Sequence, residues 1–392
     1  MNPGRRQFGC ALCGLASLSL LGSALAQQSA ADEGFLAPGY RPPAGSDELG
    51  LWKMMDRAER DLMRSRFVVH DPALNAYIRD IVCRLGKDHC PDLRPYIVRT
   101  PHFNASMAPN GMMQVWTGLL LRCVDEAQLA AVIGHEMGHY LRRHSLKVFR
   151  DVRDKASFSA FLGLGLAVAG AGQVADLTDL VLMASIFAFS RDQEREADRI
   201  GLELMAKAGY APLAAPEVWD QLLAELRAGT APRSRNILFA SHPLPEERMQ
   251  TLTGAARGAA GAPAERGEAR YRANLASIRE QLVRDELALR QYARSEVVFD
   301  RLLAQTQHDG MLWYAKGEIY RLRAEAGDAG RALQAYEKAL QARGAPPETY
   351  RSIALVEMKE GARDRARRAI DAYLQLRPDA SDAEALRTLL AE

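Results

Sequence analysis

The chain has 392 residues, of which 48% are hydrophobic and 26% charged, and this length corresponds to two or three domains of about 150 residues. The composition excludes wholesale disorder, a collagen-like repeat and a coiled coil. The formal net charge is +2, and both surplus charges, Arg5 and Arg6, lie in the first 26 residues, which contain no acid. The rest of the chain is neutral, so its bulk charge predicts no nucleic-acid partner and gives no reason to expect an anionic membrane as one.

The N-terminus predicts an export signal over residues 1–26. Arg5 and Arg6 are followed by an uncharged apolar run from Phe8 to Leu21 and by a small-x-small cleavage site at Ala24–Ala26. The run is too short for a transmembrane helix. The two arginines also resemble a twin-arginine signal, so a Sec route and a twin-arginine route both stay open. Export indicates an oxidising compartment, in which cysteines can form disulfides.

Three cysteines lie beyond the predicted signal. Cys83 and Cys90 flank a short polar turn that a disulfide between them would close, and Cys123 is then the odd one out. The alternative is a buried free thiol at Cys83. Three cysteines at these spacings make a poor metal site.

The predicted fold class is mainly α with a small β-sheet. Helical spacing is clear over Leu49–Phe67, Asp71–Leu85, Glu126–Val148 and Arg191–Lys207, and short strands are predicted at Tyr96–Val98 and Met112–Trp116. The predicted segments after the signal are a flexible leader at 27–47, a first domain at 48–252, a Gly/Ala-rich linker at 253–268 and a helical domain at 269–392.

The helical domain contains a repeat with a period of 34 residues. Gly327, Ala332, Ala335, Tyr336 and Leu340 align with Gly361, Ala366, Ala369, Ile370 and Leu374, and a degenerate first copy lies around residues 290–307. The pattern resembles tetratricopeptide helix pairs, in which small residues lie where two helices touch. It predicts a helical solenoid that binds protein. The alternative is an ordinary helical bundle with coincidental spacing.

The strongest chemical signal is His135-Glu136-Met137-Gly138-His139. On a helix the two histidines are one turn apart on one face, so both rings can reach a single Zn²⁺. Glu136 cannot easily join them as a ligand, but it is placed to take a proton from a water on the metal. Gly138 removes a side chain where another segment is expected to approach closely.

A second helix is expected to supply the remaining ligand. Glu194 and Asp198 share one helix face, so Glu194 is the predicted third ligand, and Asp198 is predicted to accept a hydrogen bond from a liganding histidine. Glu196 points about 160° away from that face on a helix of 100° per residue, and it is expected in solvent. The alternative is a surface helix with alternating charge.

These motifs carry a family resemblance. HEMGH, SRDQEREADRIG and SHPLPEERM resemble the HtpX and CAAX-prenyl-protease family of zinc metallopeptidases, and a signal with a repeat tail resembles its periplasmic branch, the β-barrel assembly-enhancing proteases. The resemblance implies a gluzincin-type domain over 48–252, a tetratricopeptide-like solenoid after it, and one Zn²⁺ per chain held by His135, His139 and Glu194. It implies that Glu136 is the general base.

The resemblance leaves the role of His242 open. His242 either stabilises the oxyanion of the tetrahedral intermediate, as a catalytic residue, or occupies the open metal position and keeps the enzyme latent. The third alternative is a loop histidine without a role. His144 is expected beside the ligands or at the surface rather than as a ligand.

The function implied is peptide-bond hydrolysis by an exported metalloendopeptidase in protein quality control. Its expected substrates are unfolded or misassembled proteins, and the repeats are expected to contact the outer-membrane assembly machinery. Met112–Trp116 is predicted to be the edge strand that receives an extended peptide. The apolar span 158–189 is expected to cover the active-site cleft or to lie peripherally on a membrane. The alternative is a membrane-spanning helix over Phe158–Ala175, which is 18 residues long and uncharged but contains four glycines. The competing hypothesis is a tetratricopeptide adaptor or chaperone with a latent, self-inhibited protease domain.

Overall fold

The computed structural model describes residues 34–154, 189–229, 242, 246–259 and 264–391. The predicted signal peptide, the first part of the predicted leader and all of the apolar span except Phe189 lie outside the described residues. The described part of the leader packs on the first domain, where the Leu36 amide donates to Leu141 O at 2.8 Å. No helix in the described ranges is both long enough and apolar enough to cross a membrane.

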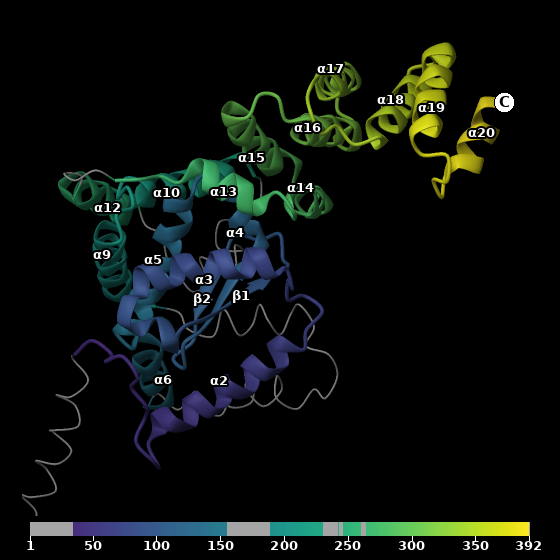
Figure 1. Cartoon of the computed structure of the whole chain (residues 1–392). Helices are drawn as coiled ribbons and strands as arrows, with labels where there is room; N and C mark the ends of the chain where they lie inside the picture. The colour runs from purple at the N-terminus through teal and green to yellow at the C-terminus, as the bar shows by residue number, and fades with distance from the viewer. Residues whose placement is uncertain (1–33, 155–188, 230–241, 243–245, 260–263, 392) are drawn as a thin grey trace, which may run out of the picture.

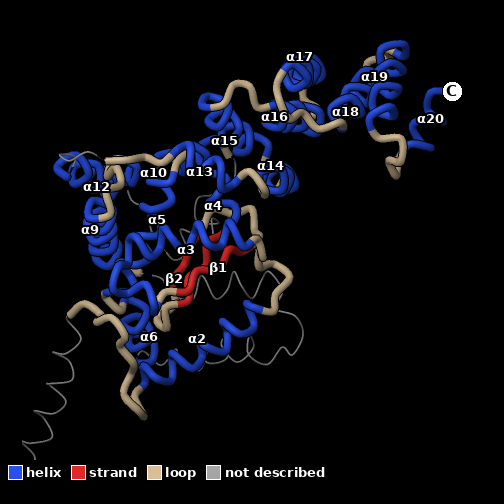
Figure 2. Tube along the Cα trace, viewed as in Figure 1, coloured by secondary structure: helices blue, strands red, loops and turns tan. Residues whose placement is uncertain are grey.

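The predicted fold class is confirmed, because the chain is mainly helical and has one three-stranded sheet. The elements up to the predicted linker are α2 (Asp47–Met63), α3 (Pro72–Gly86), the 3₁₀ helix η1 (Lys87–Asp92), β1 (Arg94–Val98), β2 (Ala105–Met107), β3 (Met112–Trp116), α4 (Thr117–Arg122), α5 (Glu126–Leu141), α6 (His144–Asp154), α9 (Arg191–Lys207), α10 (Ala214–Ala228) and α12 (Glu246–Ala259). Figure 2 shows the three strands, in red, surrounded by helices.

The sheet has the strand order β1-β3-β2, with β1 parallel and β2 antiparallel to β3. The prediction that Met112–Trp116 is an edge strand was therefore wrong, because β3 is central and the two edge strands are β1 and β2. Every residue of β3 is buried, since α3 and α5 pack near one face and α2 contributes to the cluster on the other. The strand β2 was not predicted from the sequence, because it has only three residues.

The predicted long helix over Glu126–Val148 is in fact two helices. α5 ends at Leu141 and α6 begins at His144. Between them Arg143 has a left-handed backbone (φ 54°), a conformation that a continuous helix cannot contain. The helical periodicity continued across this break, so only tertiary structure reveals it.

The C-terminal part is a series of helices that extends away from the sheet, with the C-terminus at its far end (Figure 1). Its helices are α13 (Glu268–Leu275), α14 (Arg279–Ala288), α15 (Tyr292–Gln305), α16 (Gly310–Arg323), α17 (Asp328–Gln341), α18 (Glu348–Lys359), α19 (Arg363–Leu376) and α20 (Ala383–Ala391). α16 packs on α17, and α18 packs on α19. The linker predicted over 253–268 contains ordered segments. The helix α12 continues into it as far as Ala259, and Glu265 pairs with Tyr210 in a β-bridge.

The helical hairpins follow the 34-residue period. Gly327 and Gly361 both have left-handed backbones, with φ of 79° and 77°, in the turn that joins the helices of a hairpin. Three of the aligned pairs are buried in both copies, namely Ala332 and Ala366, Ala335 and Ala369, and Tyr336 and Ile370. This arrangement supports a repeat solenoid, and its assignment to the tetratricopeptide class stays a prediction.

The degenerate first copy departs from the repeat for a structural reason. Arg301 of α15 stands where the later copies have Ala335 and Ala369. Its guanidinium donates to Glu225 Oε1 at 3.2 Å and to Gln221 O at 2.9 Å, both on α10. The first hairpin thus packs on the N-terminal part instead of on a preceding repeat.

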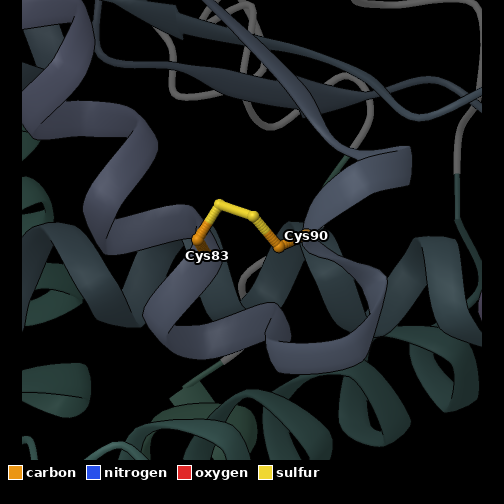
Figure 3. The surroundings of a disulfide bond; sticks show 2 residues. All are labelled: Cys83 and Cys90. Carbon is orange, nitrogen blue, oxygen red and sulfur yellow. A yellow bond between two sulfur atoms is a disulfide. The ribbon is translucent and has the colours of Figure 1, made fainter.

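Cys83 and Cys90 form a disulfide (Figure 3). It joins the end of α3 to η1 and closes the turn that the sequence suggested. Cys123 is a buried free thiol, as the pairing leaves it.

Candidate metal centre

Two helices whose backbones touch form the site. A Cβ added at Gly138 of α5 would lie 2.8 Å from Ala197 Cα of α9, and one added at Gly201 of α9 would lie 2.9 Å from His135 N. The prediction that Gly138 admits a second segment is therefore confirmed. This close approach brings Glu194 of α9 against His135 and His139 of α5.

Among the described residues, four buried side chains gather their ligand atoms within 4.8 Å of one another, namely His135, His139, Glu194 and His242. Two ligands at tetrahedral positions about 2.05 Å from a zinc ion lie about 3.3 Å apart. His135 Nε2 and His139 Nε2 are 3.1 Å apart, His139 Nε2 is 3.3 Å from Glu194 Oε1, and His135 Nε2 is 3.6 Å from Glu194 Oε2. The donor set and its spacing fit a divalent metal such as zinc.

His242 lies in the same cluster. Its Nδ1 is 2.9 Å from Glu194 Oε1 and 3.4 Å from His135 Nε2. Its Nε2 is 3.8 Å from Glu136 Oε1. His242 is thus placed where a fourth ligand would be, with its other ring nitrogen towards the predicted base.

α9 also contacts the other ring nitrogen of His135, one of the predicted ligands. Asp198 Oδ1 is 2.9 Å from His135 Nδ1, the contact predicted for this carboxylate. Arg248 of α12 donates to Asp198 Oδ1 at 2.7 Å and pairs with Glu194. Arg248 is buried, and its positive charge stabilises the charged forms of Glu194 and Asp198, which burial alone would disfavour.

The predicted ligand His139 contacts a second histidine. Its Nδ1 is 3.0 Å from His144 Nδ1, and His144 Nε2 is 3.0 Å from Glu196 Oε2. Arg142 Nε lies 2.7 Å from Glu196 Oε1. Glu196 was expected in solvent, and its side chain is 29% exposed. It is also paired on its inner side, because the break between α5 and α6 carries Arg142 and His144 back towards α9.

Aromatic rings enclose the cluster. Phe189 stacks on His139, with ring centroids 3.8 Å apart and an interplanar angle of 24°. Trp219 of α10 packs edge-on against His135, with ring centroids 5.9 Å apart. The Arg248 guanidinium carbon lies 5.6 Å from the centroid of the Trp219 ring. These apolar rings lower the polarity around the cluster and so strengthen the electrostatic interactions between its charged groups.

The pKa directions follow from burial and from the paired charges. Burial raises the pKa of Glu136, which favours proton uptake by this carboxylate. Burial also raises the pKa of Glu194, but His242, His139 and Arg248 outweigh it and hold the pKa well below its ordinary value. Burial lowers the pKa of His242, yet Glu194 and Glu136 outweigh it and raise that pKa.

The structure brings the predicted site residues together in one buried centre. Sequence reasoning missed Arg248, Trp219, Phe189 and the contact of His144 with Glu196. Arg248 lies six residues after His242, in a string that the family resemblance used, but its partners on α9 appear only in the folded chain.

Comparison with protein families gives a match to the model of peptidase family M48 over residues 69–256. The matched segment contains all the residues of the cluster. It runs from the residues before α3 to α12, so the helices after the predicted linker lie outside it.

Several curated proteins resemble the chain. The β-barrel assembly-enhancing protease of Escherichia coli K12 is 28% identical over 297 residues, 73% of this chain and 56% of that protein. The putative β-barrel assembly-enhancing protease of Vibrio cholerae is 30% identical over 203 residues, 50% of this chain and 41% of that protein. The mitochondrial metalloendopeptidase OMA1 of Schizosaccharomyces pombe is 35% identical over 161 residues, 40% of this chain and 44% of that protein. The chain thus spans about half the length of these relatives.

Proposed function

Residues 69–256 are a peptidase family M48 domain, and we propose that the chain is an exported zinc-dependent endopeptidase that hydrolyses peptide bonds of unfolded or misassembled proteins. The observation that carries the proposal is the buried His135–His139–Glu194 cluster with Glu136 on the next residue of α5. Two imidazoles and one carboxylate are a ligand set used by catalytic zinc.

Glu136 and Asp198 have distinct roles in the proposed reaction. When bound, zinc acidifies a water molecule and polarises the scissile carbonyl. Glu136 accepts the proton from the attacking water and returns it to the leaving amine, and its raised pKa suits this exchange. Asp198 fixes the ring of His135 with the nitrogen Nδ1 protonated, so that Nε2 is free to bind the metal.

The edge strand β2 is the proposed binding site for an extended substrate. The Trp116 amide donates to Asn104 O and the Ala108 amide donates to Met112 O, so in the antiparallel ladder the amides of Ala105 and Met107 face away from β3. A peptide can add a strand there through backbone hydrogen bonds. Such binding depends little on sequence and suits substrates that are unfolded or misassembled.

Metal analysis and proteolysis test this function together. The purified full chain is expected to contain one zinc per chain and to cleave casein in a reaction that a chelator stops and added zinc restores. Protein without a stoichiometric divalent metal, or cleavage that continues after metal removal, would contradict the proposal.

A second candidate function is a latent protease that acts mainly through its helical repeats. The position of His242 favours it, because Nδ1 lies 2.9 Å from Glu194 Oε1 and 3.4 Å from His135 Nε2, where it would close the metal site. His242→Ala separates the alternatives in the casein assay. A gain in cleavage indicates latency, a loss indicates a catalytic His242, and no change leaves His242 without a role.

The proposed location is the periplasm, with a role in outer-membrane protein assembly. The proposal rests on the export signal predicted over 1–26 and on the names of the Escherichia coli and Vibrio cholerae relatives. Release of the mature chain by osmotic shock is the expected result. Retention on membranes after a high-salt wash would count against a cleft-covering or peripheral apolar span and would favour the alternative in which residues 158–175 cross a membrane.

The helical part offers a proposed place for a protein partner. A cleft of about 880 Å³ lies between α14 and the loops that precede α16 and α18. Arg343 lies in it, exposed and without a side-chain ion pair in the described structure, next to the apolar wall of Pro346 and Pro347. A peptide segment with one carboxylate beside apolar residues fits this chemistry.

Peptide binding measured by fluorescence anisotropy tests the cleft. Arg343→Ala is expected to weaken binding of an acidic peptide. Arg368→Ala, which removes an exposed arginine from α19, is the matched control and should leave binding unchanged. Equal affinity of the Arg343→Ala protein and the wild type would exclude this site.

A further inference from the structure

His139 is held by two residues in series. His139 Nδ1 and His144 Nδ1 are 3.0 Å apart, and His144 Nε2 and Glu196 Oε2 are 3.0 Å apart. His139 and His144 are both buried, with 1% and 0% of their surface exposed. No water can replace these partners, so the ring nitrogens must satisfy one another.

The contacts allow one arrangement of protons when His139 binds a metal. A neutral imidazole carries one proton, and a ring that gives Nε2 to a metal keeps its proton on Nδ1. His139 Nδ1–H then donates to His144 Nδ1. His144 therefore carries its own proton on Nε2 and donates it to the Glu196 carboxylate.

The break between α5 and α6 creates this contact. In a continuous helix a residue five positions on is rotated by about 140°, so His144 would point away from His139. Instead Arg143 adopts a left-handed backbone (φ 54°) and α6 begins at His144. A non-glycine residue rarely adopts that conformation and persists in it where its surroundings require it.

α9 thus supports both liganding histidines. Asp198 contacts His135 Nδ1 directly, and Glu196 reaches His139 Nδ1 through His144. Arg142 pairs with the other Glu196 oxygen at 2.7 Å and fixes the carboxylate. The helix that is proposed to supply the ligand Glu194 therefore carries a carboxylate partner for each of the two rings.

We propose that His144 and Glu196 are positioning residues that fix His139 with Nδ1 protonated and Nε2 directed at the metal. The inference rests on the proposed metal site. Partners of this kind change metal affinity by about 10–100-fold when removed. Substitution of His144 removes the direct contact with His139, so it is expected to weaken metal binding more than substitution of Glu196.

The test is zinc affinity of the full chain, measured by competition with a chromophoric chelator at one pH. His144→Leu is expected to weaken binding about 10–100-fold, and Glu196→Gln is expected to weaken it less. His144→Gln keeps an acceptor and should recover part of the loss. Glu203→Gln, which removes an exposed carboxylate of the same helix, is the matched control and should bind zinc as the wild type does.

A second measurement uses the wild-type protein, so its result does not depend on whether a variant folds. In the zinc-loaded wild type with ¹⁵N-labelled histidine, His144 is expected to carry its proton on Nε2 and His139 on Nδ1. A proton on His144 Nδ1, or a His144→Leu protein that binds zinc as tightly as the control, would overturn the inference. If the wild type binds no zinc, both the proposed function and this inference fail. If His144→Leu and Glu196→Gln bind zinc normally, only the roles of His144 and Glu196 are rejected.

Discussion

The guanidinium of Arg122 donates through Nε to Glu225 Oε2 at 2.8 Å, and both side chains are buried. Its Nη2 also donates to Glu286 at 2.9 Å. Arg122 belongs to α4, Glu225 to α10 and Glu286 to α14. One buried cation thus joins the M48 domain to the first helical hairpin.

Removing this cation is expected to destabilise the whole chain. Arg122→Ala leaves two buried carboxylates with fewer partners, and breaking a buried ion pair from one side costs about 3–5 kcal/mol. Urea unfolding followed by circular dichroism measures the loss. Glu280→Ala removes a partner from the exposed Arg284 pair and should cost less than about 1 kcal/mol. Equal stability of the two variants would contradict this view of Arg122.

The sequence predicted the centre better than the framework around it. His135, Glu136 and His139 follow from local helical spacing, and so do Glu194 and Asp198 on one face of a second helix. The central position of β3, the break at Arg143 and the partners of Arg248 depend on contacts between distant segments. Periodicity carries no information about such contacts, so these features required the structure.

Glu136→Gln is expected to abolish cleavage and to keep the metal. The amide preserves size but cannot accept the proton, and loss of a general base costs about 10²–10⁴-fold in rate. Glu136 is not among the four residues that gather their ligand atoms in the described structure, so metal content should stay at the wild-type level. Casein cleavage and metal analysis on the same preparation measure both. Full cleavage would remove Glu136 as the base, and loss of the metal would make it a ligand.

Arg248→Met is expected to destabilise the metal-free protein more than the metal-loaded protein. Arg248 pairs with Glu194 and Asp198, and without it the two buried carboxylates lack their main cation. We expect a loss of about 3 kcal/mol or more in the metal-free state, and a smaller loss when a divalent ion supplies positive charge. Thermal unfolding with and without zinc measures the difference.

The control for Arg248 is an exposed arginine of α9. Arg199→Met removes the pair with Glu203 at the surface and should shift both states equally and slightly. If Arg248→Met lowers the melting temperature of both states by the same amount, Arg248 does not compensate for the missing metal.

Glu126, the first residue of α5, makes the free energy of unfolding depend on pH in the acidic range. Burial raises the pKa of Glu126, but hydrogen bonds from Arg270, Tyr210 and Tyr77 outweigh it and lower the pKa below 4.5. The folded state therefore binds protons less readily than the unfolded state, and each unit of difference is worth about 1.4 kcal/mol. This contribution is present above about pH 4.5 and is lost as the pH falls through the folded-state pKa.

Glu126→Gln tests that pH dependence. The variant is expected to be less stable than the wild type near neutral pH and to lose less stability between pH 6 and pH 3. Melting temperatures across this range give the comparison. A variant whose profile falls as steeply as that of the wild type would show that Glu126 does not cause the acid sensitivity.

Asn104 tests the proposed substrate strand. Its side-chain nitrogen and oxygen are both buried without a hydrogen-bond partner in the described structure, next to the edge strand β2. A peptide added to this edge can supply those partners, so Asn104→Ala is expected to raise KM several-fold and to change kcat little. The folded protein should keep its stability, because the side chain that is removed makes no hydrogen bond there. Steady-state cleavage of a fluorogenic peptide separates the two constants, and an unchanged KM would exclude Asn104 from substrate binding.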